Sequence, residues 1–185
     1  MKDEVLKDLK AKMEKTIEVF KHDLARMRTG RASVSLFDGI KVDYYGSMLP
    51  LNQVASLTVP EPRLITIQPW DTNALANIER AILKSELGLT PANDGKIIRI
   101  AIPPLTEERR KEIVKLVKKI TEEYRVILRN IRRDANEELK DLKKEKVISE
   151  DESFAVQEEV QKITDNYIKK AEQLYAEKEK EILAF

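Results

Sequence analysis

The 185 residues contain no cysteine, one histidine and one tryptophan. The lack of cysteine excludes disulfide bonds, thiolate nucleophiles and zinc sites built on cysteine. No apolar run approaches the roughly 18 residues that a membrane-spanning helix needs, and no apolar stretch of signal-peptide type follows the charged residues 1–4. These absences predict a cytoplasmic protein with no membrane partner.

The residues of common catalytic sites are also scarce. The single histidine, His22, lies in a charged stretch and is expected to face solvent. Residues 88–96 are a poor match to a phosphate loop, because six residues separate the two glycines where the loop requires four, and no Ser or Thr follows Lys96. We therefore expect a protein that is not an enzyme and that uses no cofactor and no metal.

Glycine and proline are confined to the middle of the chain, where all five glycines and all seven prolines fall between Gly30 and Pro104. Residues 30–105 hold seven basic and seven acidic residues, whereas the other 109 residues hold 27 basic and 26 acidic ones. This contrast predicts a discontinuous helical domain, residues 1–29 and 106–185, and an inserted domain, residues 30–105. The linkers between them are expected near residues 28–33 and 102–105.

The two flanking segments have apolar residues at helical spacing. We expect one helix near the start of the chain, one from residue 106 to about 145, and one that begins at Ser149 with capping-box spacing to Glu152. The short turn at residues 146–148 favours an antiparallel three-helix bundle, and an open coiled-coil dimer is the alternative. The apolar seams are expected at Leu6, Leu9, Met13, Ile17, Phe20, Leu24 and Met27; at Ile113, Val117, Ile120, Tyr124, Ile127, Ile131, Ala135, Leu139 and Leu142; and at Val156, Val160, Ile163, Tyr167, Ala171, Leu174 and Ile182.

The middle segment has a different pattern, with β-branched residues punctuated by Gly and Pro. It predicts strands at residues 40–44, 64–67 and 97–102, and Asp71 can cap a helix that ends near Gly88. Trp70 is expected to pack against the sheet rather than stack on a base. The apolar positions of this helix are Leu75, Ile78, Ile82 and Leu83. The expected fold class is α+β, a long antiparallel three-helix bundle with an inserted small β/α/β domain.

Charge is unevenly distributed along the helical segments. Residues 106–133 have a net charge of +5, with ten basic and five acidic residues, whereas residues 149–185 have a net charge of −5. At 100° per residue, basic side chains gather on one side of the second helix, where arginines could grip RNA phosphates. The alternative is a solvated face, or one paired with the acidic third helix. The candidate RNA-binding residues are Arg110, Lys111, Lys118, Arg125, Arg129, Arg132 and Arg133.

Four motifs along the chain resemble those of the ribosome recycling factor family of bacterial type. The sequence Arg-Asn-Ile-Arg-Arg-Asp-Ala-Asn at residues 129–136 is similar to the signature of the family. Residues 28–33 and 102–110 look like its two linkers, and residues 56–63 look like part of its insert. The resemblance runs along the whole chain and implies an L-shaped protein whose two domains are joined by a flexible two-stranded hinge.

The resemblance also implies a function. Members of the family bind the ribosomal RNA of the large subunit after termination, and with elongation factor G and GTP they promote dissociation into subunits. Arg129 and Arg132, with Arg110 as a further contact, match the positions at which the family touches RNA. The chain is expected to be a monomer. The implied hinge residues are Thr29, Gly30, Arg31, Ala32, Ser33, Pro103, Pro104 and Leu105.

Two other classes of function are weighed against this one. A coiled-coil adaptor would use the charged helix faces to select a partner and would form dimers in solution. An RNA chaperone would bind unstructured RNA and would need exposed aromatic side chains, for which Tyr44, Tyr45 and Trp70 are the candidates.

Overall fold

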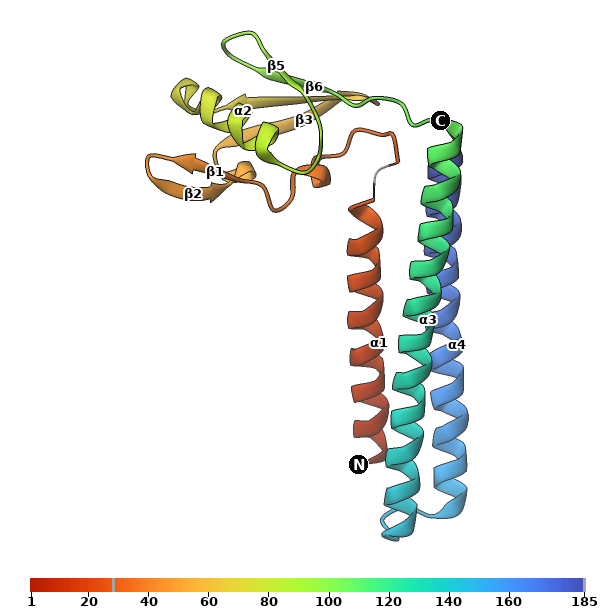
Figure 1. Cartoon of the computed structure of the whole chain (residues 1–185). Helices are drawn as coiled ribbons and strands as arrows, with labels where there is room; N and C mark the ends of the chain where they lie inside the picture. Colours follow the sequence, from red (N-terminus) through yellow and green to blue (C-terminus); the bar gives the residue numbers. More distant parts are fainter. Residues whose placement is uncertain (28, 185) are drawn as a thin grey trace. The chain divides into compact units, whose positions relative to one another are not determined.

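The computed structural model describes residues 1–27 and 29–184. These residues form two compact units, each with most of its contacts within itself. One unit joins Met1–Ala25 to Glu108–Ala184, and the other is formed by Arg26–Glu107 (Figure 1). The expected domain boundaries, after residues 29 and 105, lie within a few residues of this division and stay a prediction. Arg28 of the expected linker and Phe185 of the expected helical domain lie outside the described residues.

The first unit consists of three long helices, α1 (Lys2–Ala25), α3 (Glu107–Lys144) and α4 (Glu150–Leu183), that run side by side (Figure 1). The seam expected on the first helix is buried from Leu6 to Leu24, and Val5 joins it. Met27 does not, because the helix ends at Ala25. Across the described residues, no helix combines the length and the apolar character needed to cross a bilayer.

Side-chain contacts join the three helices to one another. The rings of Phe20 on α1 and Tyr124 on α3 lie 4.8 Å apart, and the Tyr124 hydroxyl donates a hydrogen bond to Asp23. On α4, Tyr167 Oη donates to Glu14 Oε2 of α1 at 2.8 Å. Since each amphipathic helix covers its apolar face with the other two, the expected three-helix bundle is confirmed.

The seam of α3 differs from the expected one in the middle of the helix, whereas Ile113, Val117, Ala135 and Leu139 are buried as expected. Ile127 is 42% exposed, whereas Thr121 and Leu128 are buried. Thr121 Oγ1 donates to the Val117 carbonyl at 2.7 Å, so its hydroxyl is satisfied and the side chain is buried at little cost. The placement of Ile127 in the seam was therefore wrong. The buried positions of α3 are Ile113, Val117, Thr121, Leu128, Ala135 and Leu139.

The turn between α3 and α4 begins at the expected place. Lys146 has a φ of 58°, and the Val147 N–H donates to the Leu142 carbonyl at 2.9 Å, which satisfies one of the free carbonyls at the end of α3. The expected capping box at the start of α4 is confirmed, because Ser149 Oγ accepts from the Glu152 N–H at 3.2 Å and Glu152 Oε2 accepts from the Ser149 N–H at 3.0 Å.

The second unit contains two antiparallel sheets and one α-helix. Strands β1 (Lys41–Tyr44) and β2 (Ser47–Pro50) form a hairpin. The other sheet has the order β3-β4-β6-β5 and is made of β3 (Ala55–Glu61), β4 (Leu64–Pro69), β5 (Pro91–Asn93) and β6 (Ile98–Ala101). The three expected strands correspond to β1, β4 and β6, whereas β2, β3 and β5 were missed.

Helix α2 (Leu75–Lys84) contributes to the core of this unit, because Ile78 and Ile82 are fully buried in one cluster with Ile65, Ile67 and the isoleucines of β6. Asp71 caps a short 3-10 turn, Thr72–Ala74, that precedes α2, through a hydrogen bond from the Asn73 N–H at 2.9 Å. The predicted helix is thus present, but it ends at Lys84. Leu83 is exposed and does not join the core.

Trp70 is 68% exposed, so the expectation that it packs against the sheet was wrong. Its position follows from the alternation of β4, in which Ile65, Ile67 and Pro69 are buried. Successive side chains of a strand point to opposite faces, and continuing this alternation places the side chain after Pro69 on the outer face.

Replacement of the capping serine tests the start of α4. We expect Ser149→Ala to lower the free energy of unfolding by about 1 kcal/mol, because it removes the acceptor for the Glu152 N–H. Ser149→Asp, which keeps an acceptor, should retain most of the stability. Urea denaturation followed by helical circular dichroism measures this, with Ser47→Ala in the hairpin as the control. Equal stability of the alanine and aspartate variants would contradict the role of the cap.

Two tyrosines should make the stability of the bundle depend on pH in the alkaline range. Burial raises the pKa of Tyr124 and of Tyr167 to about 12, and hydrogen bonds to Asp23 and Glu14 add to this effect. A tyrosine in an unfolded chain has a pKa of about 10. Between these values the unfolded chain releases protons that the folded one keeps, so the free energy of unfolding should fall as the pH rises.

The measurement is urea denaturation between about pH 10 and about pH 12, the window between the unfolded and the folded pKa of the two tyrosines. We expect the double variant Tyr124→Phe, Tyr167→Phe to lose less stability over this window than the unsubstituted chain. An identical decline in both proteins would show that other groups govern the alkaline sensitivity.

Candidate RNA-binding surface on helix α3

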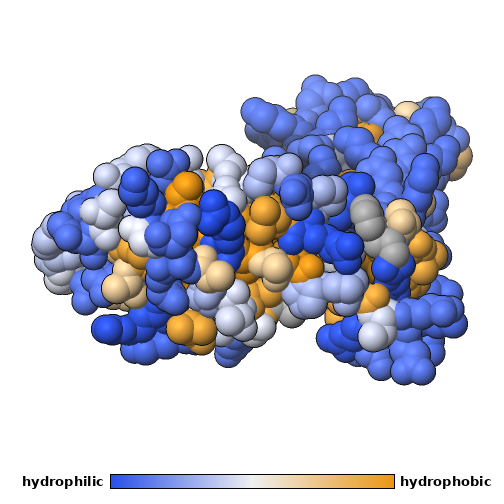
Figure 2. All heavy atoms as spheres, turned by 90° about the horizontal axis from the view of Figure 1, so that it is seen from above, coloured by the Kyte–Doolittle hydropathy of each residue, from blue (hydrophilic) through white to orange (hydrophobic). Residues whose placement is uncertain are grey.

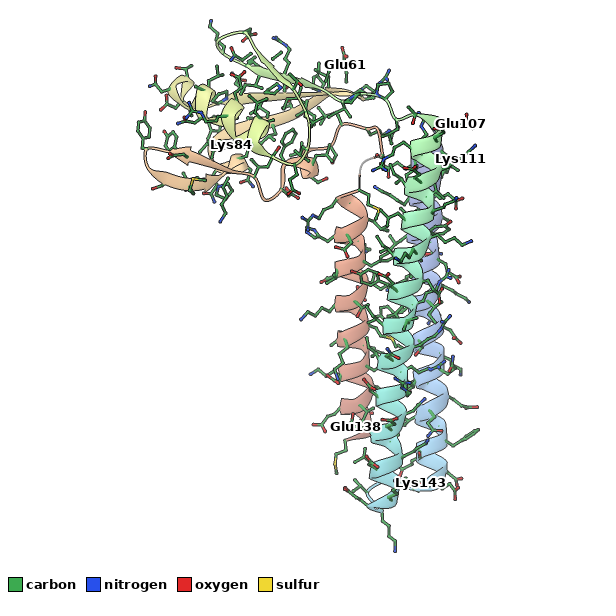
Figure 3. The ribbon with its side chains drawn as sticks, in the orientation of Figure 1. Glu61, Lys84, Glu107, Lys111, Glu138 and Lys143 are labelled. Atoms are coloured by element: carbon green, nitrogen blue, oxygen red, sulfur yellow. The ribbon has the colours of Figure 1, made fainter. Side chains whose placement is uncertain are left out.

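All seven candidate RNA-binding residues lie on α3, a helix of 38 residues that is about 57 Å long at 1.5 Å per residue. Lys111 lies near the start of the helix and Lys143 near its end (Figure 3). Along the helix, the basic side chains near residue 110 are separated from those near residue 130 by about 30 Å. The basic residues thus form a start region near residue 110 and a middle region near residue 130, with Lys118 between them.

The middle region lies along the side of α3 that faces α4. Arg125 Nη2 lies 3.4 Å from Glu172 Oε1, and Arg132 Nη1 donates to Gln161 Oε1 at 3.2 Å, and both partners belong to α4. The Arg125 side chain is only 26% exposed. The alternative of intramolecular pairing thus holds for Arg125, whose role in RNA binding stays a prediction.

Glu122 is the acidic residue within the basic surface. Its carboxylate pairs with Arg125 Nη1 and with Arg129 Nη1, each at 3.1 Å. The hydrogen bond from Arg125 is the main cause that lowers the pKa of Glu122, and the bond from Arg129 lowers it further. The carboxylate therefore stays charged and fixes the two guanidinium groups on the same side of the helix.

Arg129, Arg132 and Arg133 line one surface depression of about 360 Å³. Sequence reasoning missed Asn136 and Lys140 of the same depression, although both follow Arg133 at helical spacing, three and seven residues later. The Asn136 Oδ1 atom is buried and has no hydrogen-bond partner among the described residues. The depression thus combines four basic residues and one acidic residue, Glu137, with the amide groups of Asn130 and Asn136. Its lining residues are Arg129, Asn130, Arg132, Arg133, Asn136, Glu137 and Lys140.

The start of α3 forms the second region. Arg110 is half-buried, and its buried Nε atom has no hydrogen-bond partner within residues 1–27 and 29–184. Lys111 and Lys118 are exposed on the following turns. At 100° per residue, Lys118 lies on the same side of the helix as Arg125 and Arg132. The structure therefore does not bring Arg110 to the depression at Arg129, but it places both on one helix.

The expected hinge residues lie in the second unit. Ala32 N–H donates to the Pro62 carbonyl at 2.7 Å, and Ile102 N–H donates to the Arg63 carbonyl at 2.8 Å. Both linkers are therefore attached to adjacent residues of the same turn between β3 and β4. Gly30 has a φ of 80°, and a Cβ atom there would lie 3.5 Å from the Leu105 side chain.

A small cavity of about 70 Å³ also lies between the two linkers, lined by Gly30, Arg31, Leu36, Leu89, Ile102, Pro103, Pro104 and Leu105. Thr29 is buried. Ser33 caps a 3-10 turn, Val34–Phe37. The predicted linker segments thus lie side by side. Their action as a hinge stays a prediction.

No cluster of three or more metal-ligating side chains occurs in the described parts of the chain. His22 is exposed, as expected. The surface on α3 therefore offers guanidinium, ammonium and amide groups, which suit the recognition of phosphate and polar RNA groups.

Comparison with known proteins identifies the family. A sequence model described as "Ribosome recycling factor" matches residues 20–183. The chain belongs to the ribosome recycling factor family. Ribosome recycling factors from Desulfosudis oleivorans and Syntrophobacter fumaroxidans are each 60% identical to it, over 97% of both chains in the first case and 99% of both in the second. The expected family is thereby confirmed, and with it the expectation of a translation factor that is not an enzyme.

Solved ribosome recycling factor structures have the same α+β fold. The solution structure of one ribosome recycling factor is 46% identical, with a TM-score of 0.81 over 100% of this chain and 98% of the other. In a second structure, a T. thermophilus ribosome recycling factor and the E. coli elongation factor G are bound to the E. coli post-termination complex. Its matching chain is 51% identical, with a TM-score of 0.68 over 99% of both chains.

The contacts of Arg125 and Arg133 predict different effects on stability. Arg125→Ala should lower the free energy of unfolding by about 1 kcal/mol, because it removes side-chain packing against α4 and the ion pair to Glu172. Arg133→Ala should change it by less than about 0.5 kcal/mol, since this side chain is exposed and donates a hydrogen bond to Asn130 of its own helix.

Urea denaturation of both variants measures the difference, and Arg125→Met, which keeps the apolar stem, should lie between them. If Arg125→Ala were as stable as Arg133→Ala, Arg125 would have no structural role and its side chain would be available to RNA.

Proposed function

We propose that the chain acts in ribosome recycling: it binds the large ribosomal subunit after termination and, with elongation factor G and GTP, promotes dissociation of the post-termination complex into subunits. Family membership supports this function. It is further supported by the relative that is bound together with elongation factor G on a post-termination complex. The chain would do this in the cytoplasm. It would act as a monomer, because its three helical seams are covered within one chain.

The depression on α3 is the observation that carries the RNA contact. Arg129 and Arg132 are the residues that we assign to ribosomal RNA, with Arg133 beside them and Arg110 as a contact about 30 Å away. Arginine binds phosphate through a planar fork of donors. Contacts of this kind give affinity that falls with salt and depends little on base sequence.

The two linkers would let the second unit change its orientation while the bundle stays bound. Their attachment to Pro62 and Arg63 holds both linkers on one turn of that unit, so bending would concentrate in the residues between this turn and the helices. Proline restricts the backbone at positions 103 and 104. The linkers would therefore allow movement in few directions, which is what a force-transmitting hinge requires.

Sedimentation of the chain with post-termination ribosomes at several salt concentrations tests the RNA contact. Arg129→Ala and Arg132→Ala should each weaken binding to large subunits and reduce the slope of log affinity against log salt by about 1. Lys143→Ala, at the far end of α3, is the matched control and should bind as the unsubstituted chain does. Unchanged affinity and slope in Arg132→Ala would show that this residue does not contact RNA.

Loosening the return linker separates binding from splitting. The double variant Pro103→Gly, Pro104→Gly should bind large subunits normally, because α3 is untouched. It should split ribosomes at least several-fold more slowly with elongation factor G and GTP, because the linker loses its restricted backbone. Light scattering follows the splitting and sedimentation follows the binding. Splitting at the full rate would rule out force transmission through the prolines.

A further inference from the structure

A second basic surface lies on the inserted unit. Helix α2 and the β1–β2 hairpin border a groove of about 510 Å³. The lining of this groove includes the basic residues Lys41, Arg80 and Lys84. Lys84 is at the end of α2 (Figure 3). The hairpin is held against the helix by a hydrogen bond from Asn77 Nδ2 to the Asp43 carbonyl at 3.0 Å. The groove is thus formed by elements that are fixed to each other.

The groove has an excess of positive charge. Lys41, Arg80 and Lys84 take part in none of the ion pairs found within residues 1–27 and 29–184. Asp43 is the acidic residue of the lining, and its Oδ1 atom accepts a hydrogen bond from the Gly46 N–H at 3.1 Å. The three cations are therefore available to an anionic ligand.

Exposed aromatic side chains stand beside this groove. Tyr45 is 74% exposed and Trp70 is 68% exposed, although large aromatic side chains are usually well buried. On the face seen from above, Figure 2 shows hydrophobic residues of aliphatic type, in orange, among hydrophilic ones; tyrosine and tryptophan are pale on this hydropathy scale. Asp43 and Met48 line the groove and pair with each other in the hairpin. Tyr45 follows Asp43 by two residues, so the chain leads from the groove to the Tyr45 side chain within about 7 Å of strand.

The ring of Tyr45 is held in place. Its hydroxyl donates to Asp71 Oδ2 at 2.8 Å, and the ring lies edge-on to Tyr44 with 4.6 Å between the centroids. Tyr44 Oη donates to the same carboxylate oxygen at 3.3 Å. Asp71, which accepts both hydrogen bonds, directly follows Trp70 in the chain. A ring that is both exposed and fixed loses little conformational entropy when a ligand stacks on it.

We propose that this surface binds a single-stranded segment of RNA, with phosphates in the groove at Lys41, Arg80 and Lys84 and bases stacked on Tyr45 and Trp70. A basic groove next to aromatic platforms is the combination that single-stranded nucleic acid requires. An acidic peptide would satisfy the cations but would leave the two fixed rings without a use. The proposal concerns the inserted unit and does not depend on the function proposed for α3.

Trp70 makes the site directly observable, because it is the only tryptophan of the chain. The full chain carrying Arg129→Ala and Arg132→Ala, which weakens RNA binding at α3, is titrated with a mixed-sequence single-stranded RNA of about 12 nucleotides, within the usual site size. We expect saturable quenching of the tryptophan fluorescence. For three phosphate contacts, log affinity should fall with log salt with a slope of about −2.

Variants divide the site into its two parts. Arg80→Ala with Lys84→Ala should reduce the salt slope by about 1.4, which corresponds to two phosphate contacts. Tyr45→Ala should weaken binding by about tenfold through the loss of stacking. Lys96→Ala is the control, because Lys96 is an exposed lysine of the same unit outside the groove. Arg80 and Lys84 are exposed, and an unchanged circular dichroism spectrum would confirm that their replacement leaves the fold intact.

Three outcomes would overturn the proposal. The first is an absence of quenching at low salt. The second is quenching that is the same in the Arg80→Ala, Lys84→Ala variant, which would show that the groove does not bind phosphate. The third is poly-glutamate that displaces the RNA at equal charge concentration, which would assign the surface to an acidic protein partner instead.

Discussion

Mutual burial of three apolar seams is the constraint on which the bundle depends. No amphipathic helix can cover its own apolar face, and α1 is separated from α3 along the chain by the whole inserted unit. The bundle therefore closes only because segments distant in sequence pack together, as shown by Phe20 against Tyr124 and Tyr167 against Glu14. The insertion is tolerated because both of its ends lie at the same turn, near Pro62 and Arg63.

The same packing decides which arginines can serve RNA. Arg125 and Arg132 lie on the side of α3 that faces α4. Arg125 is then partly used for helix packing, whereas Arg129, Arg132 and Arg133 remain around an accessible depression. Glu122 organises this surface and does not cancel it, because it fixes two guanidinium groups with one carboxylate. In the proposed function, one run of basic residues would thus serve both helix packing and RNA binding.

Much of the fold could be predicted from the sequence, because periodicity and capping are local signals. The three helices, the capping box at Ser149 and three strands are of this kind. The choice between Ile127 and Leu128 for the seam could not be made, since both fit a heptad and only contacts with α1 and α4 separate them. Strand β3 was missed because Pro60 lies within it, at a register shift between Thr58 and Glu61 where no ladder hydrogen bond is lost.

The candidate site was predictable in part. Charge and spacing single out the arginines of α3, whose RNA contacts stay a prediction, but the position of Asn136 beside them involves a buried amide oxygen that no charge pattern reveals. The exposure of Trp70 could have been found by extending the alternation of β4. The first case depends on neighbours in space, whereas the second follows from a local pattern of the strand.

The uninterrupted hydrogen-bond ladder of α3 has a consequence for what the chain can recognise. Arg110 and Arg133 lie on one helix without a proline or glycine between them, so their separation along the axis, about 35 Å, cannot adapt to the ligand. Such a helix holds the two arginines at a fixed distance from each other. It would select an RNA by the spacing of its phosphates in three dimensions, and selectivity could then arise without the reading of a single base.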